Sequence, residues 1–217
     1  MEKNINPQEL SSQQVPEIVA LSAKALVDLL KKEDATIHEI FNDYIDIVKK
    51  LFQEKKDWCP VCFFIFRDYK KPMWKAACYP MFNPAPGAME FHAQVLRKLI
   101  REMKGGEQNE FKLVGVMRVM DAFVSKYERD EIMTPDGEID RTKFVSPRND
   151  PKAIDVLQFE LEEIFVKHCK SWEYIKSDAG DIVYKDTPYI DDKMPFDEVA
   201  NKNSNMAFLF TEGARQN

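Results

Sequence analysis

The longest apolar stretch of the chain covers residues 58–82 and is interrupted once, by a polar run over 68–72 that contains an Asp and a Pro. Asp favours turns and Pro cannot donate to a sheet ladder, so the interruption predicts a turn. The apolar residues on both sides are rich in β-branched and aromatic types, which suit a pleated sheet. We therefore predict a β-hairpin with strands over 59–67 and 73–82. The near-continuous apolar run in the first strand indicates burial on both faces.

Two amphipathic segments come before this hairpin. Apolar residues recur at helical spacing over 12–32, after a possible cap at Ser11 or Ser12, and again over 36–56. The second segment begins with Thr-Ile-His-Glu, which has the spacing of a capping box. Because few residues separate the segments, we predict an antiparallel αα-hairpin that covers the sheet. A third helix is predicted over 88–104, where two glycines follow and end it.

Two further segments fit either a helix or a strand. Residues 111–128 are rich in Val and aromatic side chains, and Gly115 weakens a helix there. Residues 153–165 alternate apolar and polar side chains in part, although an Asp-Pro pair before them also suits a helix start. We predict strands for both segments and expect them to pair with each other. Another hairpin is predicted around the Asp-Ala-Gly-Asp turn at 178–181, with arms over 172–176 and 182–185.

One part of the chain resembles a known pattern. The sequence Met-Asp-Ala-Phe-Val at 120–124 is followed by a polar loop and then by Asp-Pro-Lys-Ala at 150–153. This arrangement is similar to one found in small uncharacterised α/β proteins, in which both segments are strand boundaries. The resemblance covers residues 110–163, about a quarter of the chain. It implies strands on both sides of the loop and implies no activity.

Together these elements predict an α+β domain with an N-terminal αα-hairpin, a mixed or antiparallel sheet of about five strands, and one covering helix. The domain is expected over residues 12–186, divided into the helical hairpin at 12–56 and a sheet-containing part at 57–186. Residues 1–11 and 187–217 are polar and irregular, and we predict that they form extended terminal arms.

Composition and charge narrow the choice of partners. The chain of 217 residues is 44% hydrophobic, enough for a sizeable core. Residues 1–110 hold 16 Lys/Arg and 16 Asp/Glu, whereas residues 111–217 hold 15 and 21, so the net charge of −6 falls on the second half. This acidity makes nucleic acid an unlikely main partner, since phosphate binding needs a basic face. The sequence lacks an apolar run of about 20 residues and an apolar N-terminus, so we expect no membrane span and a cytoplasmic protein with reduced thiols.

Cys59, Cys62, Cys78 and His92 are the one set of residues whose types suit a four-ligand zinc site. However, residues three apart on one strand face opposite sides of a sheet. Buried cysteines without metal are therefore the simpler interpretation, and no cofactor is expected. The same residues offer a nucleophile and a base, which makes a small hydrolase or nuclease an alternative function.

The other two histidines, His38 and His168, lie far from each other in the sequence. Catalytic partners meet in space rather than in sequence, so a Cys–His or Ser–His pair stays open. Surface or core packing is the default interpretation for each histidine. The chain has only seven glycines, and none of them forms a phosphate-binding loop or flanks a nucleophilic serine in the required pattern.

In the absence of a catalytic signature, we expect a non-enzymatic structural or adaptor protein that assembles with copies of itself or with other subunits. A component of a phage or virus particle would suit this pattern. The expected contact residues are apolar and acidic side chains of the C-terminal arm, namely Met206, Phe208, Leu209, Phe210, Asp191 and Asp192. A zinc-stabilised binding module is a further alternative.

Overall fold

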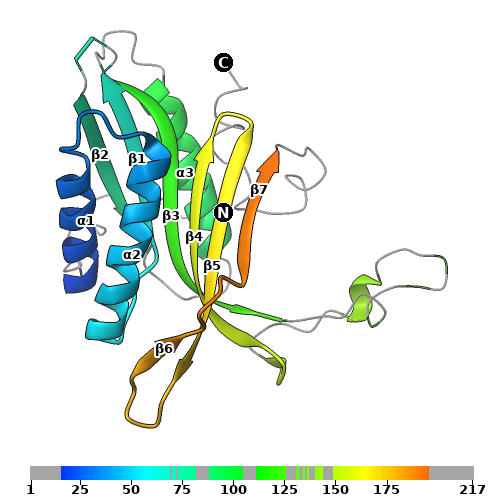
Figure 1. Cartoon of the computed structure of the whole chain (residues 1–217). Helices are drawn as coiled ribbons and strands as arrows, with labels where there is room; N and C mark the ends of the chain where they lie inside the picture. The colour runs from blue at the N-terminus through cyan, green and yellow to red at the C-terminus, as the bar shows by residue number, and fades with distance from the viewer. Residues whose placement is uncertain are drawn as a thin grey trace, which may run out of the picture.

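The computed structural model shows an α+β fold built on one curled antiparallel sheet (Figure 1), which confirms the predicted fold class. Its description covers residues 16–68, 70–71, 73–81, 88–104, 111–125, 131, 134, 136, 140–143 and 149–195. Figure 1 shows the two N-terminal helices on the near face of the sheet and the third helix behind it.

The described helices and strands follow one another along the chain in a simple order. The helices are α1 (Glu17–Leu29), α2 (Ile37–Lys55) and α3 (Ala88–Lys104), and a short 3-10 helix, η2 (Arg141–Lys143), precedes the fourth strand. The strands are β1 (Val61–Asp68), β2 (Met73–Pro80), β3 (Phe111–Val124), β4 (Ile154–Glu163), β5 (Val166–Lys176), β6 (Ile182–Tyr184) and β7 (Ile190–Pro195). In the sheet they lie in the order β2-β1-β3-β4-β5-β6, and β7 also pairs with β5.

Both ambiguous segments are strands, and they pair with each other as predicted, with Val119 opposite Phe159. The sheet is larger than the predicted one of about five strands. β7 adds a strand, because it lies inside the predicted C-terminal arm and its backbone pairs with β5. β5 is also longer than predicted, since it begins well before the predicted hairpin arm at 172–176. The rest of both predicted arms, residues 1–11 and 196–217, lies outside the described residues.

The α1–α2 hairpin forms as predicted. The Thr36 hydroxyl accepts from the Glu39 amide at 3.2 Å, and the Glu39 carboxylate accepts from the Thr36 amide at 2.8 Å, which completes the capping box. Helix α1 begins directly after Pro16, and the caps predicted at Ser11 and Ser12 lie outside the described residues. The antiparallel packing of α1 on α2 follows from apolar faces buried in one core.

The sheet has a core on each face, because successive residues of β1 point in opposite directions. Phe63 and Ile65 enter the core under α1 and α2, whereas Cys62 and Phe64 enter the core under α3. This arrangement accounts for the near-continuous apolar run in the sequence of β1. The first core is the larger, and its fully buried members include Leu26, Ile40, Tyr44, Val48, Phe52, Met117, Leu157, Phe159 and Leu161.

Gly115 on β3 lies close to the first residue of α2, Ile37. A Cβ atom added there would lie 2.9 Å from Ile37 Cδ1 and 3.3 Å from the Glu162 carbonyl oxygen. The Ile37 methyl group can move, but the Glu162 carbonyl is fixed because β4 pairs with β3 there. We therefore expect Gly115→Ala to lower the free energy of unfolding by about 1–2 kcal/mol. Urea denaturation measures this change, and an unchanged midpoint would contradict tight packing of α2 on β3.

Asp121 on β3 is a partly buried carboxyl group, and its Oδ1 accepts from the Tyr174 hydroxyl at 2.6 Å. Burial raises the pKa of Asp121 above its ordinary value of 3.8, and the hydrogen bond from Tyr174 only partly opposes this. A carboxyl pKa that is higher in the folded state favours folding at low pH, and this contribution is lost as the pH rises through the raised pKa.

Asp121→Asn keeps an acceptor for Tyr174 and removes the charge. We expect the variant to be more stable than the wild type at pH 7, by less than about 1 kcal/mol because the group is partly solvated. The two proteins should converge as the pH falls towards 4. Urea denaturation at both pH values measures the difference, and a variant that is less stable at pH 7 would contradict the raised pKa of Asp121.

Candidate metal centre

The structure does not bring the four residues of the predicted zinc set together. Cys62 pairs with Tyr79 and lies on the α3 face of the sheet, whereas Cys78 pairs with Phe63 and lies on the α1–α2 face. His92 is buried on α3, where its Nδ1 lies 3.0 Å from the Tyr79 hydroxyl. Within the described parts of the chain, no cluster of metal-binding side chains contains any of the four.

Burial raises the pKa of all four cysteine thiols. The pKa rises to about 11 for Cys59 and Cys78 and to about 12 for Cys169, and it rises further still for the fully buried Cys62. The thiolate is both the nucleophile and the metal ligand, so protonated thiols are poor in both roles. This result counts against a cysteine nucleophile, on which the alternative hydrolase depends.

A different set of residues meets at one end of the sheet: His38, Glu163 and His168. His38 Nε2 lies 3.0 Å from Glu163 Oε2, and His168 Nε2 lies 3.6 Å from the same oxygen. The two imidazole rings meet edge to face with their centroids 4.5 Å apart. One possible ligand atom from each residue lies within 4.8 Å of the other two.

Three elements hold these side chains in place. The capping box fixes the first turn of α2, where Ile37 is buried and the next residue, His38, faces the end of the sheet. The register of β4 and β5 places Leu161 opposite His168, so Glu163 lies two residues further along on the same face. A two-residue turn at 164–165 joins the strands and keeps the two side chains close.

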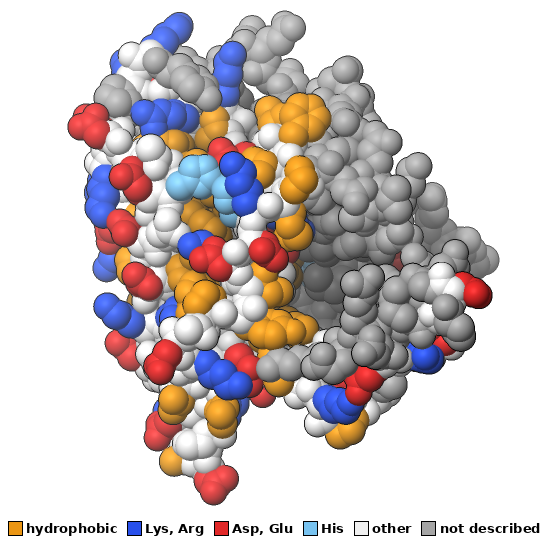
Figure 2. All heavy atoms as spheres, turned by 45° about the vertical axis from the view of Figure 1, so that its right-hand side comes forward, with side chains coloured by type: hydrophobic (Ala, Val, Ile, Leu, Met, Phe, Trp, Pro, Cys, Tyr) orange, Lys and Arg blue, Asp and Glu red, His pale blue; other side chains and the backbone are white. Residues whose placement is uncertain are grey.

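The site is partly open to solvent. The side chains of His38, Glu163 and His168 are 46%, 27% and 19% exposed. Figure 2 shows histidine side chains (pale blue) on the surface, with a basic side chain (blue) directly beside them. The His168 Nε2 atom itself is buried and has no hydrogen-bond partner among the described residues. Burial lowers the pKa of His168, and nearby His38 lowers it further, which favours the neutral ring, the form that binds metals.

Two imidazole nitrogens and one carboxylate oxygen are a donor set used by Zn²⁺ and by other divalent first-row metals. Around a tetrahedral ion with bonds of about 2.0–2.1 Å, neighbouring ligand atoms lie about 3.3 Å apart. The 3.0 Å and 3.6 Å separations at Glu163 lie on either side of this value. Three protein ligands leave at least one coordination position open. Mg²⁺ and Ca²⁺ are disfavoured, since they prefer oxygen ligands.

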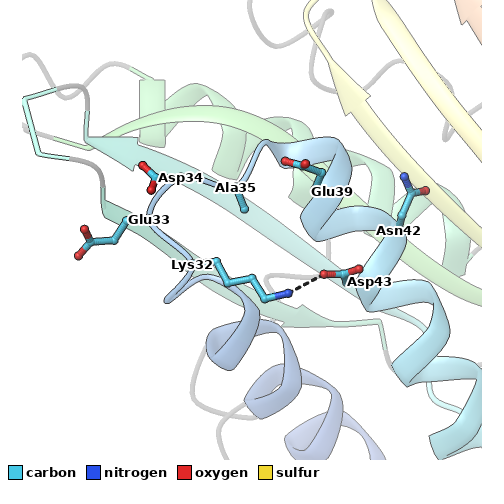
Figure 3. Close-up of a pocket in the computed structure, with 7 residues that line it drawn as sticks. All are labelled: Lys32, Glu33, Asp34, Ala35, Glu39, Asn42 and Asp43. Carbon is cyan, nitrogen blue, oxygen red and sulfur yellow. Dashed lines mark hydrogen bonds and ion pairs between the residues drawn. The ribbon is translucent and has the colours of Figure 1, made fainter.

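A second candidate region is an open hollow of about 680 Å³ at the α1–α2 connection (Figure 3). It is lined by Lys32, Glu33, Asp34, Ala35, Glu39, Asn42 and Asp43. In Figure 3, Lys32 reaches across to Asp43, with its Nζ 2.7 Å from the carboxylate, while Glu33 points away. Glu39 is already used by the capping box. The charged groups of this hollow are therefore explained by the helical hairpin.

Of the predicted contact residues, only Asp191 and Asp192 are described. Both are exposed on β7, and Asp191 Oδ1 lies 3.4 Å from Lys170 Nζ. The four apolar ones, Met206, Phe208, Leu209 and Phe210, lie outside the described residues. None of the helices described here is long and apolar enough to cross a membrane.

Comparison with known proteins assigns no family: no family model matches the chain, and no curated protein or solved structure is significantly similar to it. The resemblance of residues 110–163 to small α/β proteins finds no support there. Inferences about function rest on the geometry of the site alone.

The sequence contains only a weak signal for this site. Glu163 and His168 flank the short β4–β5 turn, so a hairpin there brings them to one face. Recognising this requires β5 to begin at Val166, before the predicted hairpin arm. The sequence around His38 does not indicate that it belongs to the site, because the contact of His38 with the β4–β5 hairpin depends on where α2 crosses the sheet.

Proposed function

We propose that this protein binds a divalent transition-metal ion such as Zn²⁺ through His38, Glu163 and His168. The observation that carries the proposal is the convergence of two imidazole Nε2 atoms on one carboxylate oxygen, at 3.0 Å and 3.6 Å. The three residues come from α2, β4 and β5. A bound ion would therefore fasten the start of α2 to the β4–β5 hairpin.

A simple ion pair explains this convergence less well. One carboxylate can pair with one protonated histidine, but two imidazolium rings at 4.5 Å would repel each other. The separation of 3.6 Å between His168 Nε2 and Glu163 is also too long for a hydrogen bond. A cation shared by two neutral imidazoles and the carboxylate satisfies all three groups. The far end of α2 already has a direct link, from Lys56 Nζ to Asp181 at 2.6 Å.

Calorimetric titration of the chelator-treated full chain with Zn²⁺ tests the proposal. We expect one ion per chain. His168→Ala and Glu163→Gln should each weaken binding by about 100-fold or more, since the loss of an outer-sphere partner alone costs about 10–100-fold. Glu54→Gln is the matched control, because Glu54 is exposed near the C-terminal end of α2, away from the site. Equal affinity in all of these proteins would refute the proposed ligands.

A second candidate function is the assembly role expected from the sequence, in which the protein is a structural or adaptor subunit. It is favoured by one observation: Ile164 and Phe165, in the turn beside the site, are 50% and 53% exposed. Apolar side chains at a hairpin tip are suited to contact with another subunit. Light scattering with and without Zn²⁺ tests this role. A discrete oligomer that Phe165→Ser dissociates would support it, and a monomer throughout would refute it.

A further inference from the structure

The surroundings of the proposed metal site are positively charged. Lys193 on β7 lies directly opposite His168 on β5, so both side chains project from the same face of the sheet. Lys193 is exposed, and no ion pair to it occurs among the described residues. A neighbouring lysine on this face of β5, Lys170, is already paired with Asp191 at 3.4 Å. Figure 2 shows a basic side chain (blue) beside the histidines.

The proposed ligands do not neutralise a divalent ion. Two neutral imidazoles and the Glu163 carboxylate leave one formal positive charge on the metal, and Lys193 adds another. His38 lies in the first turn of α2, where the helix dipole adds partial positive charge. Glu39, the acidic side chain in that turn, accepts hydrogen bonds from Thr36 and keeps its negative charge. Counting Glu39, the sum over the bound ion, Glu163 and Lys193 is still positive.

We propose that the open coordination position of the bound ion takes an oxyanion, that is, a phosphate or carboxylate group, which Lys193 contacts from β7. This inference rests on the proposed metal binding. An anionic oxygen would complete the coordination of the ion and balance the excess charge. Directly opposed residues in a sheet have Cβ atoms about 5 Å apart, so the long lysine side chain reaches a ligand held above His168. Lysine binds phosphate as a point charge.

Cobalt-loaded protein tests this inference, because the visible absorption of Co²⁺ changes when a ligand enters its coordination shell. Inorganic phosphate and acetate are titrated separately into the Co²⁺-loaded full chain and, by calorimetry, into the metal-free chain. We expect saturable spectral changes that require the metal. Lys193→Ala should weaken anion binding by about fivefold, which corresponds to the Coulomb energy of one exposed charge contact. The affinity for Co²⁺ should not change. Lys24→Ala, an exposed lysine on α1, should have no effect.

The outcomes separate the two proposals. If Co²⁺ does not bind, the proposed function fails and this inference fails with it. If Co²⁺ binds but neither anion changes its spectrum, the metal function stands and this inference is refuted. Equal anion affinity with and without metal, or an unchanged affinity in Lys193→Ala, also refutes it. A response to phosphate alone or to acetate alone identifies which oxyanion the site accepts.

Discussion

Replacement of Arg118 by Leu should lower the free energy of unfolding by about 3–5 kcal/mol, because it removes a buried cation that pairs with two buried carboxylates. The Arg118 side chain is fully buried, and its Nη2 lies 2.7 Å from Glu160 and 3.4 Å from Glu162. Lys167 also contacts Glu160, at 3.3 Å. Burial alone would raise the pKa of Glu160, but Arg118 and Lys167 outweigh it and hold that pKa below its ordinary value.

Urea denaturation of Arg118→Leu measures this effect. A combined variant, in which Glu160→Gln and Glu162→Gln accompany Arg118→Leu, should be more stable than the single variant, because it no longer buries two carboxylate charges that have lost Arg118. If the single variant does not fold, Arg118→Lys keeps a charge without the planar fork and should give an intermediate loss. A loss below about 1 kcal/mol for Arg118→Leu would show that water replaces the ion pairs.

Zinc should stabilise the folded protein. The three proposed ligands lie on α2, β4 and β5, so the unfolded chain does not hold them together. An ion that binds only the folded state raises the free energy of unfolding by about 2.7 kcal/mol when its free concentration is about 100 times Kd. Urea denaturation at buffered free Zn²⁺ concentrations measures this shift, which should grow with the logarithm of the concentration.

Two variants locate the source of that stabilisation. His38→Ala should remove most of the stabilisation by zinc. Without metal, the free energy of unfolding of this variant should be close to that of the wild type, since His38 is half exposed. Cys78→Ser should keep the full effect, because Cys78 lies on β2 and takes no part in the site. Loss of the zinc effect in Cys78→Ser, with retention in His38→Ala, would show that a thiol binds the ion instead.

The sequence predicts those parts of the fold in which burial leaves a clear pattern. The capping box at Thr36 and the apolar face of α2 specify a helix, and the doubly buried β1 appears as a continuous apolar run. β3 and β4 were predicted as strands because they carry β-branched, aromatic or alternating residues. β7 gives no such pattern, because it pairs with β5 through its backbone while its central side chains are charged and exposed.

The candidate site could not be predicted in the same way. His38, Glu163 and His168 are each ordinary surface residues in their local sequence, and they meet only because α2 crosses the sheet at a particular place. That crossing depends on long-range packing, including the close approach of Ile37 to Gly115. The cysteines lie closer to one another in the sequence than the three site residues do, which makes them the more obvious candidate ligands. However, the alternation of side chains along the strands places Cys62 and Cys78 on opposite faces.

The most direct test of metal binding is nitrogen-15 NMR of the imidazole rings during zinc titration. The chain has three histidines, so His92, which is buried against Tyr79, serves as an internal control. One equivalent of Zn²⁺ should shift the Nε2 resonances of His38 and His168 together and leave those of His92 in place. Unchanged resonances for His38 and His168, or a shift confined to His92, would contradict the proposed metal site.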